Sequence, residues 1–146
     1  MTTATPVPVP DPASESGQAV IRRLESELIA WLTTVTADGR PQSSAVWFLW
    51  ADGEFTIYSR AGAPRARNVA ANGNVSVHLN SDAEGDDIVT FEAVARLEPG
   101  ALPASASPAY LAKYGHLIER YGWTPESFSR DYPDPIRIRP SRLRLG

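Results

Sequence analysis

The stretch that decides the fold runs from Trp31 to Ser59 and reads WLTTVTADGRPQSSAVWFLWADGEFTIYS. Two Asp-Gly pairs, Asp38-Gly39 and Asp52-Gly53, divide it into runs rich in β-branched and aromatic residues. Such runs favour strands, and Asp-Gly is a strong hairpin signal because glycine accepts a positive φ. Two hairpins in succession predict an antiparallel meander with strands over 31–36, 41–50 and 55–59.

The end of the middle strand, Ala45–Trp50, is apolar at every position. A strand with one solvated face alternates apolar and polar residues, so a continuous apolar run must be covered on both faces. A barrel of this size covers only one face of a strand. We therefore expect the second face to pack against another copy of the chain, in a homodimer.

Helices and further strands flank this meander. Apolar residues recur at helical spacing from Val20 through Leu24, Leu28 and Leu32, which predicts an amphipathic helix ending near Ala30. Strands are expected over 74–80, 88–97 and 136–145, and helices over 64–71, from Ser107-Pro108 to Gly122, and at Thr124-Pro125-Glu126. Six short strands with three or four helices predict a mostly β (α+β) fold, a small antiparallel barrel with peripheral helices.

Composition excludes several classes of protein. The chain has 146 residues, which is the size of one domain, and its net charge of −3 argues against generic nucleic-acid binding. It has no cysteine and two histidines, so zinc fingers, iron–sulfur clusters and three-histidine metal sites are excluded, and we expect no metal. Lys113 is the single lysine and thus the single candidate for Schiff-base chemistry. No apolar run approaches the ~18 residues of a membrane span.

The first seventeen residues have a composition of their own. Met1–Gly17 carries four prolines and neither an aromatic nor a basic side chain. Alternating proline favours an extended polyproline conformation that buries little, so we expect a disordered tail over 1–17 and a folded domain over 18–146. A secretory signal needs a basic start with an apolar middle, and a transit peptide needs arginines. We therefore expect a cytoplasmic protein.

A segment without acidic residues, 55–81, contains three arginines: Arg60, Arg65 and Arg67. Here a predicted strand ends at Ser59, a glycine-containing loop follows, and a helix begins at Pro64. Backbone N–H groups at a helix start, a serine hydroxyl and guanidinium groups together make an anion site suited to a phosphate. The alternative is a solvated loop whose arginines merely reflect a composition with one lysine.

Two further groups of residues are candidates for binding. The large flat side chains in Val46-Trp47-Phe48-Leu49-Trp50 suit a planar cofactor with a phosphate tail, although a barrel core or a subunit interface explains them too. Four arginines near the C-terminus lie at strand spacing and either bind a ligand or keep a strand edge solvated. These are Arg137, Arg139, Arg142 and Arg144.

Three of these stretches carry a family resemblance: Asp38–Trp50, Ile57–Val77 and Val89–Leu97. In order and spacing they resemble the pyridoxamine 5′-phosphate oxidase-like split β-barrel superfamily. The tryptophan-containing second strand and the ending Tyr132–Pro140 are similar to the branch that uses the deazaflavin coenzyme F420. The resemblance covers residues 20–145 and implies a six-stranded antiparallel split β-barrel. It further implies hydride transfer from reduced F420 to a small unsaturated or electron-poor organic substrate.

The resemblance also implies a set of cofactor-binding residues. Arg65 matches the basic residue that holds the cofactor phosphate, and Ser59 matches a hydroxyl residue that contacts the same phosphate. Arg60 is a candidate for the acidic tail of F420. The full implied set is Val46, Trp47, Phe48, Tyr58, Ser59, Arg60, Arg65, Arg67 and Asn68. Family sites lie at a two-fold interface, which again implies a homodimer.

Some positions depart from the family pattern. FMN-dependent oxidases of the superfamily typically have an arginine where this chain has Ser43 or Ser44, and the family's fifth strand usually has a glycine where this chain has Ala93. The chain also lacks the characteristic pyridoxal-phosphate-binding end of the true oxidase. Two alternatives to an F420-dependent reductase stay open. One is an FMN-dependent oxidoreductase of the same fold, and the other is a flavin- or deazaflavin-binding protein without turnover.

Overall fold

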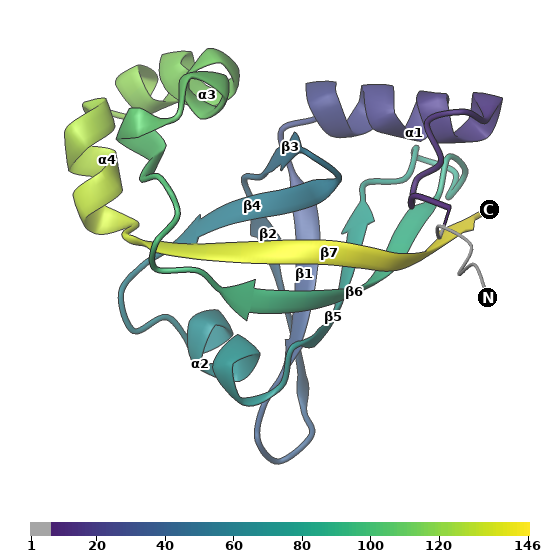
Figure 1. The fold of residues 1–146 in the computed structure, drawn as a ribbon, viewed down its shortest axis with the longest axis horizontal. Coiled ribbons are helices and arrows are strands. Elements are labelled where there is room, and N and C mark those ends of the chain that lie inside the picture. Colours follow the sequence, from purple (N-terminus) through teal and green to yellow (C-terminus); the bar gives the residue numbers. More distant parts are fainter. Residues whose placement is uncertain (1–6) are drawn as a thin grey trace, which may run out of the picture.

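The computed structural model describes residues 7–146, so the first six residues of the predicted tail lie outside the described residues. A curled antiparallel sheet forms the body, and four α-helices lie around it (Figure 1). In chain order the elements are α1 (Glu15–Ser26), β1 (Ala30–Val35), β2 (Pro41–Val46), β3 (Leu49–Ala51), β4 (Glu54–Ser59), α2 (Pro64–Ala71), β5 (Asn74–Leu79), β6 (Val89–Leu97), the short 3-10 turn Ala104–Ala106, α3 (Pro108–Arg120), α4 (Pro125–Asp131) and β7 (Asp134–Leu145).

The strand order shows why the sheet must curl. It runs β2-β1-β5-β6-β7-β4-β3, so β2 and β3, neighbours in the chain, lie at opposite edges. A flat sheet would hold these edges about 29 Å apart at ~4.8 Å per strand spacing. Only Trp47 and Phe48 join them, and a link of that length spans at most about 11 Å. The edges therefore approach each other, which produces the predicted antiparallel split barrel with peripheral helices.

The link also corrects the predicted strand count. The run expected as one strand over 41–50 is two strands, β2 and β3, so the sheet has seven strands rather than six. The apolar run is only partly covered within a single chain, because Ala45 is exposed and Trp47, Leu49 and Trp50 are half-buried. Phe48 is fully buried in the barrel core, whereas Trp47 packs among the helices α3 and α4. Surface of the run thus remains available for contact with a second copy of the chain.

The barrel interior follows from the period of two in the strands. Buried and more exposed residues alternate along β1, β5 and β6, as the sequence predicts. Aromatic side chains fill the centre, where Phe55 meets both Phe48 and Phe91 at ring-centroid distances of 5.7 and 5.5 Å. The fully buried aliphatic side chains of this core are Leu24, Leu32, Ile57, Val77, Ile136 and Ile138.

The residues at one hairpin turn and at one β-bulge suit the backbone conformation found there. Asp52 and Gly53 both have positive φ, 55° and 75°, as a two-residue hairpin of the favoured hand requires. Pro140 in β7 cannot donate to a sheet ladder, and it lies where the pairing with β6 shifts register between Glu92 and Ala93. The hydroxyl of Ser141 donates to the carbonyl of Glu92 at 3.0 Å within this bulge.

The first helix lies earlier than predicted. It begins at Glu15 and ends at Ser26, and Leu32, expected on its apolar stripe, is instead a fully buried residue of β1. Glu27 ends the helix because its backbone is extended, with φ −76° and ψ 141°. The expected domain start at Gln18 thus falls inside α1, and residues 15–17 of the predicted disordered tail are helical.

Residues just before α1 also make contacts. Val9 packs against the barrel core, and the Ser14 hydroxyl caps α1 by accepting from the Gly17 N–H at 2.9 Å. The same hydroxyl donates to the carbonyl of Asp11 at 3.1 Å. The described part of the predicted tail is therefore docked on the domain rather than separate from it.

The helices α3 and α4 form a second apolar cluster beside the barrel. Tyr110, Tyr114, Ile118 and Phe128 are buried in it, and Tyr58 of β4 joins it from the sheet. Serine and threonine caps start both helices where the sequence places them. In Figure 1 this pair lies at the end of the sheet opposite α1 and the C-terminus. None of the helices in residues 7–146 combines the length and hydropathy that a membrane crossing needs.

Replacing Ser14 tests whether the helix start belongs to the folded domain. Ser14→Ala removes the cap, and we expect it to lower the free energy of unfolding by about 1 kcal/mol in urea denaturation. Ser16→Ala is the matched control, because Ser16 lies exposed in the first turn of α1 and should change stability little. Equal stability of the two variants would contradict the docked helix start.

Candidate functional site

A cavity of about 210 Å³ opens between the sheet edge and the helices α3 and α4, and we call it the aromatic cavity. Its lining residues are Ala45, Val46, Trp47, Tyr58, Arg65, Tyr110, Trp123, Phe128 and Tyr132. Four members of the implied set, Val46, Trp47, Tyr58 and Arg65, thus meet at one place. A larger groove of about 730 Å³ lies between residues 7–12 and β7, and none of the implied residues lines it.

Parallel rings form one wall of the aromatic cavity. Trp47 stacks on Tyr114 with ring centroids 4.7 Å apart and planes 8° from parallel. Its ring also faces Phe128 at 5.8 Å, and Phe128 stacks on Tyr132 at 4.7 Å. The guanidinium of Arg60 covers the ring of Tyr132 at 4.5 Å and so continues the stack to the surface. Such a wall offers planar surface to a planar ligand.

Arg65 is the one charged residue in this lining. It follows Pro64, the first residue of α2, and the first turn of α2 carries no acidic residue. Its side chain is half-buried, and burial lowers the pKa of the guanidinium from its ordinary value while Tyr132 opposes that shift. Among residues 7–146 no carboxylate forms an ion pair with Arg65. The cavity thus holds a partly desolvated positive charge without a countercharge.

Ser59 adds an unused polar group at the end of β4. It follows the cavity-lining Tyr58 in the chain and is 1% exposed. Its hydroxyl has no hydrogen-bond partner among the described residues. A buried hydroxyl without a partner costs free energy, and native proteins rarely leave one unpaired. Ser59 and Arg65 flank the loop over 60–64, so the chain supplies an orphan donor and an unpaired cation from one short segment.

Phe48 serves the site through its backbone. Its side chain lies in the barrel core, its N–H donates to the Tyr114 hydroxyl at 2.9 Å, and its carbonyl accepts from Lys113 Nζ at 2.9 Å. The Tyr114 hydroxyl also lies 2.8 Å from the carbonyl of Leu28, to which it donates. These contacts fix the link between β2 and β3 and with it the position of Trp47.

Five implied residues lie outside the cavity lining: Phe48 and Ser59, described above, and Arg60, Arg67 and Asn68. The Arg67 side chain is exposed and donates to the carbonyl of Gly62 at 2.6 Å. Asn68 is buried, and its amide nitrogen donates to Thr34 and Gln42, both at 3.0 Å, which ties α2 to β1 and β2. Arg60 reaches the rim only through its stack on Tyr132.

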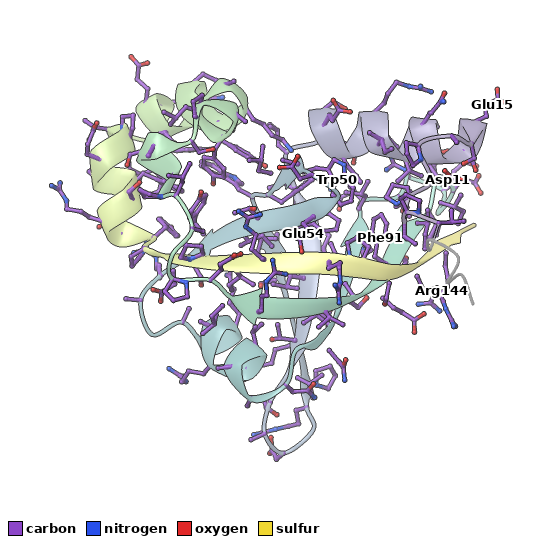
Figure 2. The ribbon with its side chains drawn as sticks, in the orientation of Figure 1. Asp11, Glu15, Trp50, Glu54, Phe91 and Arg144 are labelled. Carbon is purple, nitrogen blue, oxygen red and sulfur yellow. The ribbon has the colours of Figure 1, made fainter. Side chains whose placement is uncertain are left out.

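The arginines of β7 do not gather at the cavity. Arg137 pairs with Glu98 at 3.3 Å and lies 3.8 Å from Glu54, while Arg142 pairs with Glu92 at 3.4 Å. Figure 2 shows Arg144 at the far end of β7, away from α3 and α4. Arg137 and Arg142 are thus paired with carboxylates, as arginines on a solvated sheet face would be.

The sequence matches the family model described as pyridoxamine 5′-phosphate oxidase over residues 17–145. The chain belongs to this family. The match spans almost the whole described domain, and it agrees with the curled antiparallel sheet. No functionally curated protein sequence matches the chain.

Solved structures with the same fold carry names that indicate different functions. An F420 reductase is 24% identical, with 84% of this chain and 94% of that one covered and a TM-score of 0.63. The heme storage protein HutZ from Vibrio cholerae is 23% identical, with 88% and 92% covered and a TM-score of 0.63. A conserved hypothetical protein from Mycobacterium tuberculosis is 25% identical, with 98% and 88% covered and a TM-score of 0.63. At these identities the likeness establishes the fold.

Sequence reasoning missed the helical half of this pyridoxamine 5′-phosphate oxidase-family site. Tyr110, Trp123, Phe128 and Tyr132 line the cavity, and of these only Tyr132 was singled out as part of the ending that carries the family resemblance. A signal was present, because the segment 110–132 is rich in aromatic residues. Spacing within α3 and α4 does not reveal that both helices fold back against the link at Trp47.

The Tyr114 hydroxyl offers a test of how the link is held. Tyr114→Phe keeps the ring stacked on Trp47 but leaves the Phe48 N–H and the Leu28 carbonyl without this partner. We expect a loss of about 1–3 kcal/mol in the free energy of unfolding, measured in urea. Tyr121→Phe, at a residue that is 63% exposed, is the matched control and should cost much less. If both variants unfold alike, the hydroxyl does not hold the link.

Proposed function

We propose that the protein is an F420-dependent oxidoreductase that transfers hydride from the reduced deazaflavin to a small, electron-poor organic substrate. The observation that carries this proposal is the unpaired, half-buried Arg65 in a cavity walled by aromatic rings. A cofactor with a flat ring system and a phosphate complements both features. The F420 reductase among the structural neighbours and the resemblance of the second strand support the choice of F420.

The residues fit a phosphate group. Arg65 supplies a guanidinium that can donate two parallel hydrogen bonds to phosphate oxygens. The orphan hydroxyl of Ser59 can donate a further one, and binding would relieve its unpaired state. The absence of carboxylates from 55–81 removes a source of repulsion for an anion in this segment.

When bound, the deazaflavin supplies the hydride, and the chain supplies position and surroundings. The Tyr114–Trp47 stack presents a rigid flat surface, because the Tyr114 hydroxyl is anchored on backbone groups on both sides. The Tyr58 hydroxyl is engaged with the carbonyl of Leu102 at 2.8 Å, and burial raises its pKa. Tyr58 thus stays a neutral wall residue. No side chain of the cavity is required as a general acid, since water can protonate the product.

FMN is the alternative cofactor, because it too joins a phosphate to a tricyclic ring. The arginine typical of FMN oxidases is replaced here by serine, and Ser43 bonds Thr33, with the two hydroxyl oxygens 2.6 Å apart. This contact engages Ser43 within the sheet, and the missing arginine favours F420 over FMN. A binding protein without turnover is the remaining alternative, and oxidation of reduced F420 by a quinone such as menadione separates it from a reductase.

A second copy of the chain would complete this site. The aromatic cavity, about 210 Å³, is smaller than the roughly 300–1,000 Å³ typical of sites that enclose a cofactor-sized ligand. Val94 and Leu97 on β6 and Leu102 beyond it leave 43%, 40% and 62% of their surface exposed, which offers apolar area for an interface. The family resemblance, with sites at a two-fold interface, supports the same arrangement. We therefore propose a homodimer.

Arg65 is the residue whose replacement tests the proposed cofactor. Arg65→Ala should weaken F420 binding by about 10- to 150-fold, since a charge-assisted hydrogen bond contributes roughly 1.5–3 kcal/mol. Arg65→Lys should lose less because the charge remains. The affinity of the parent protein should fall as salt rises. Calorimetric titration with F420, FMN and hemin side by side measures affinity and ranks the three ligands.

Arg22→Ala is the control for this titration, because Arg22 is an exposed arginine of α1 far along the chain from the cavity. It should bind F420 as the parent does. Unchanged F420 affinity in Arg65→Ala would remove the proposed anion site. Tighter binding of FMN or hemin than of F420 would replace the proposed cofactor.

Sedimentation tests the proposed homodimer. At micromolar concentration the protein should sediment as a dimer of 15.9 kDa chains, both with and without F420. Val94→Glu places a charge on the exposed face of β6 and should shift the dimer toward monomer. A parent protein that sediments as a monomer under both conditions would contradict the shared site.

A further inference from the structure

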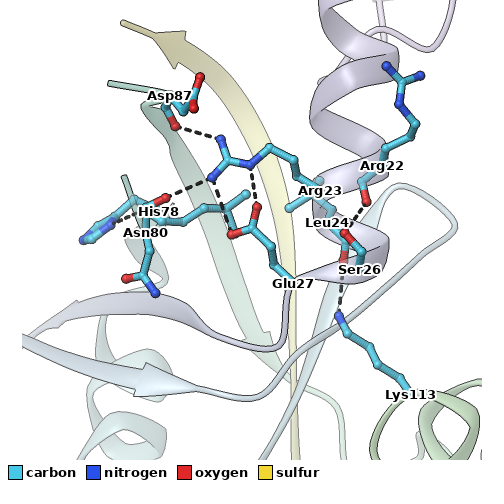
Figure 3. Close-up of polar contacts among 10 residues, drawn as sticks. Arg22, Arg23, Leu24, Ser26, Glu27, His78, Asn80, Asp87 and Lys113 are labelled. Carbon is cyan, nitrogen blue, oxygen red and sulfur yellow. Dashed lines mark hydrogen bonds and ion pairs between the residues drawn. The ribbon is translucent and has the colours of Figure 1, made fainter. Parts of the chain in front are cut away.

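The single lysine of the chain, Lys113, lies in an unusual place for an ammonium group. It projects from α3 to the end of α1, where its Nζ donates to the carbonyl of Leu24 at 3.2 Å (Figure 3). It also donates to the carbonyl of Phe48 at 2.9 Å, and it lies over the Phe48 ring, 3.8 Å from the centroid. The amine thus connects α1, the β2–β3 link and α3.

These two carbonyls lack other backbone partners for structural reasons. Leu24 lies in the last turn of α1, where carbonyls have no further N–H along the helix. Phe48 lies in the link between strands, outside the ladder of the sheet. Lys113 satisfies both, and a neutral amine can do so as well, because it retains two N–H donors and frees its lone pair.

Burial disfavours the charge of Lys113, whereas the two carbonyls and the Phe48 ring favour it. Burial lowers the pKa of its ammonium to about 8, although Glu27 on α1 opposes that shift. The acidic groups nearby are Glu25, which lines the adjoining pocket, and Glu27, which is already paired with Arg23. With a pKa of about 8, the neutral fraction at pH 7 rises from about one in 3,000 to about one in ten.

A pocket of about 380 Å³ opens onto this amine. Its other walls are apolar or small apart from one carboxylate: Leu49, Trp50, Ala109, Ala112 and Glu25. We propose that Lys113 is a modification site that accepts a small acyl group, such as acetyl, from an activated acyl donor. The methyl of an acetyl group suits the two alanines of this pocket.

The step balances without any further reagent. The Lys113 nitrogen attacks the acyl carbonyl carbon, a C–N bond forms, and the C–O bond of an acyl phosphate or the C–S bond of a thioester breaks. Phosphate or thiolate leaves with the bonding electrons, and the amine proton passes to solvent. The product amide keeps one N–H donor where the ammonium had three. The amide can then bond only one of the two carbonyls, of Leu24 or Phe48, although the Tyr114 hydroxyl also lies 3.0 Å from the Phe48 carbonyl.

Mass spectrometry after incubation with acetyl phosphate, or separately with acetyl-coenzyme A, tests the proposal. Lys113 in the folded protein should be acetylated at least about tenfold faster at pH 7 than in a free peptide of residues 108–120, since the gain in neutral amine exceeds the loss in nucleophilicity. Its rate should level off above about pH 8, whereas the rate of the peptide should keep rising. Faster reaction with either donor supports the site and identifies the source of the acyl group. Reaction no faster than the peptide with both donors overturns it.

Two variants test what the modification changes. Lys113→Gln imitates the acylated side chain and should lower the melting temperature by roughly 3–10 °C, because the shorter, uncharged side chain loses the bonds of Lys113 to the carbonyls of Leu24 and Phe48. Lys113→Arg keeps a cation with several donors and should lose less. If Lys113→Gln melts at the same temperature as the parent protein, the contacts of Lys113 do not hold α1, the link and α3 together. The acetylation rates of the parent protein remain the test of the modification site itself.

Discussion

Two residues, Trp47 and Phe48, join the opposite edges of a seven-stranded sheet, and this short link constrains the rest of the molecule. The sheet curls because the link is short, and the curl creates an interior that aromatic side chains fill. The link also divides its own side chains between two cores. Phe48 packs inside the barrel, while Trp47 packs against α3 and α4 and supplies a wall of the aromatic cavity.

Backbone groups in the link cannot join the sheet ladder, so other elements must satisfy them. Tyr114 and Lys113, neighbours on α3, bond the N–H and carbonyl of Phe48. Their aliphatic and aromatic parts pack at the same time, and the ring of Tyr114 lies flat on Trp47. The same contacts therefore hold the barrel closed and orient the cavity wall. This couples the stability of the link to the geometry of the site.

The strands and turns were predictable because their signals are local. The Asp-Gly hairpins and the alternation in β5 and β6 specify elements that the structure confirms, and α2 has the predicted bounds Pro64–Ala71. The break at Trp47 was not predictable from periodicity, because a run that is apolar throughout looks the same whether its faces belong to one strand or to two cores. The end of the first helix was misplaced for a related reason. Leu28 and Leu32 continue a helical spacing by coincidence, and Leu32 is buried by β1 instead.

Half of the candidate site was predictable and half was not. Val46, Trp47, Tyr58 and Arg65 meet at the cavity because they come from elements whose order the sequence specifies. The rings of Phe128 and Tyr132 reach it only through the tertiary docking of α4. The resemblance implied that Asn68 binds the cofactor. Its amide nitrogen instead donates to Thr34 and Gln42, so a role inferred from sequence position alone does not hold for this residue.

The distribution of charge argues for an anionic ligand more strongly than any single residue does. Arg96, Arg137 and Arg142 lie on strands and each finds a carboxylate. Arg65 is half-buried and, within residues 7–146, pairs with none, while the orphan hydroxyl of Ser59 lies at the other end of the same loop. A chain with more acidic than basic residues could readily neutralise one more arginine. An unpaired, half-buried Arg65 lowers the stability of the free protein. An anion that binds there removes this penalty, which strengthens its binding.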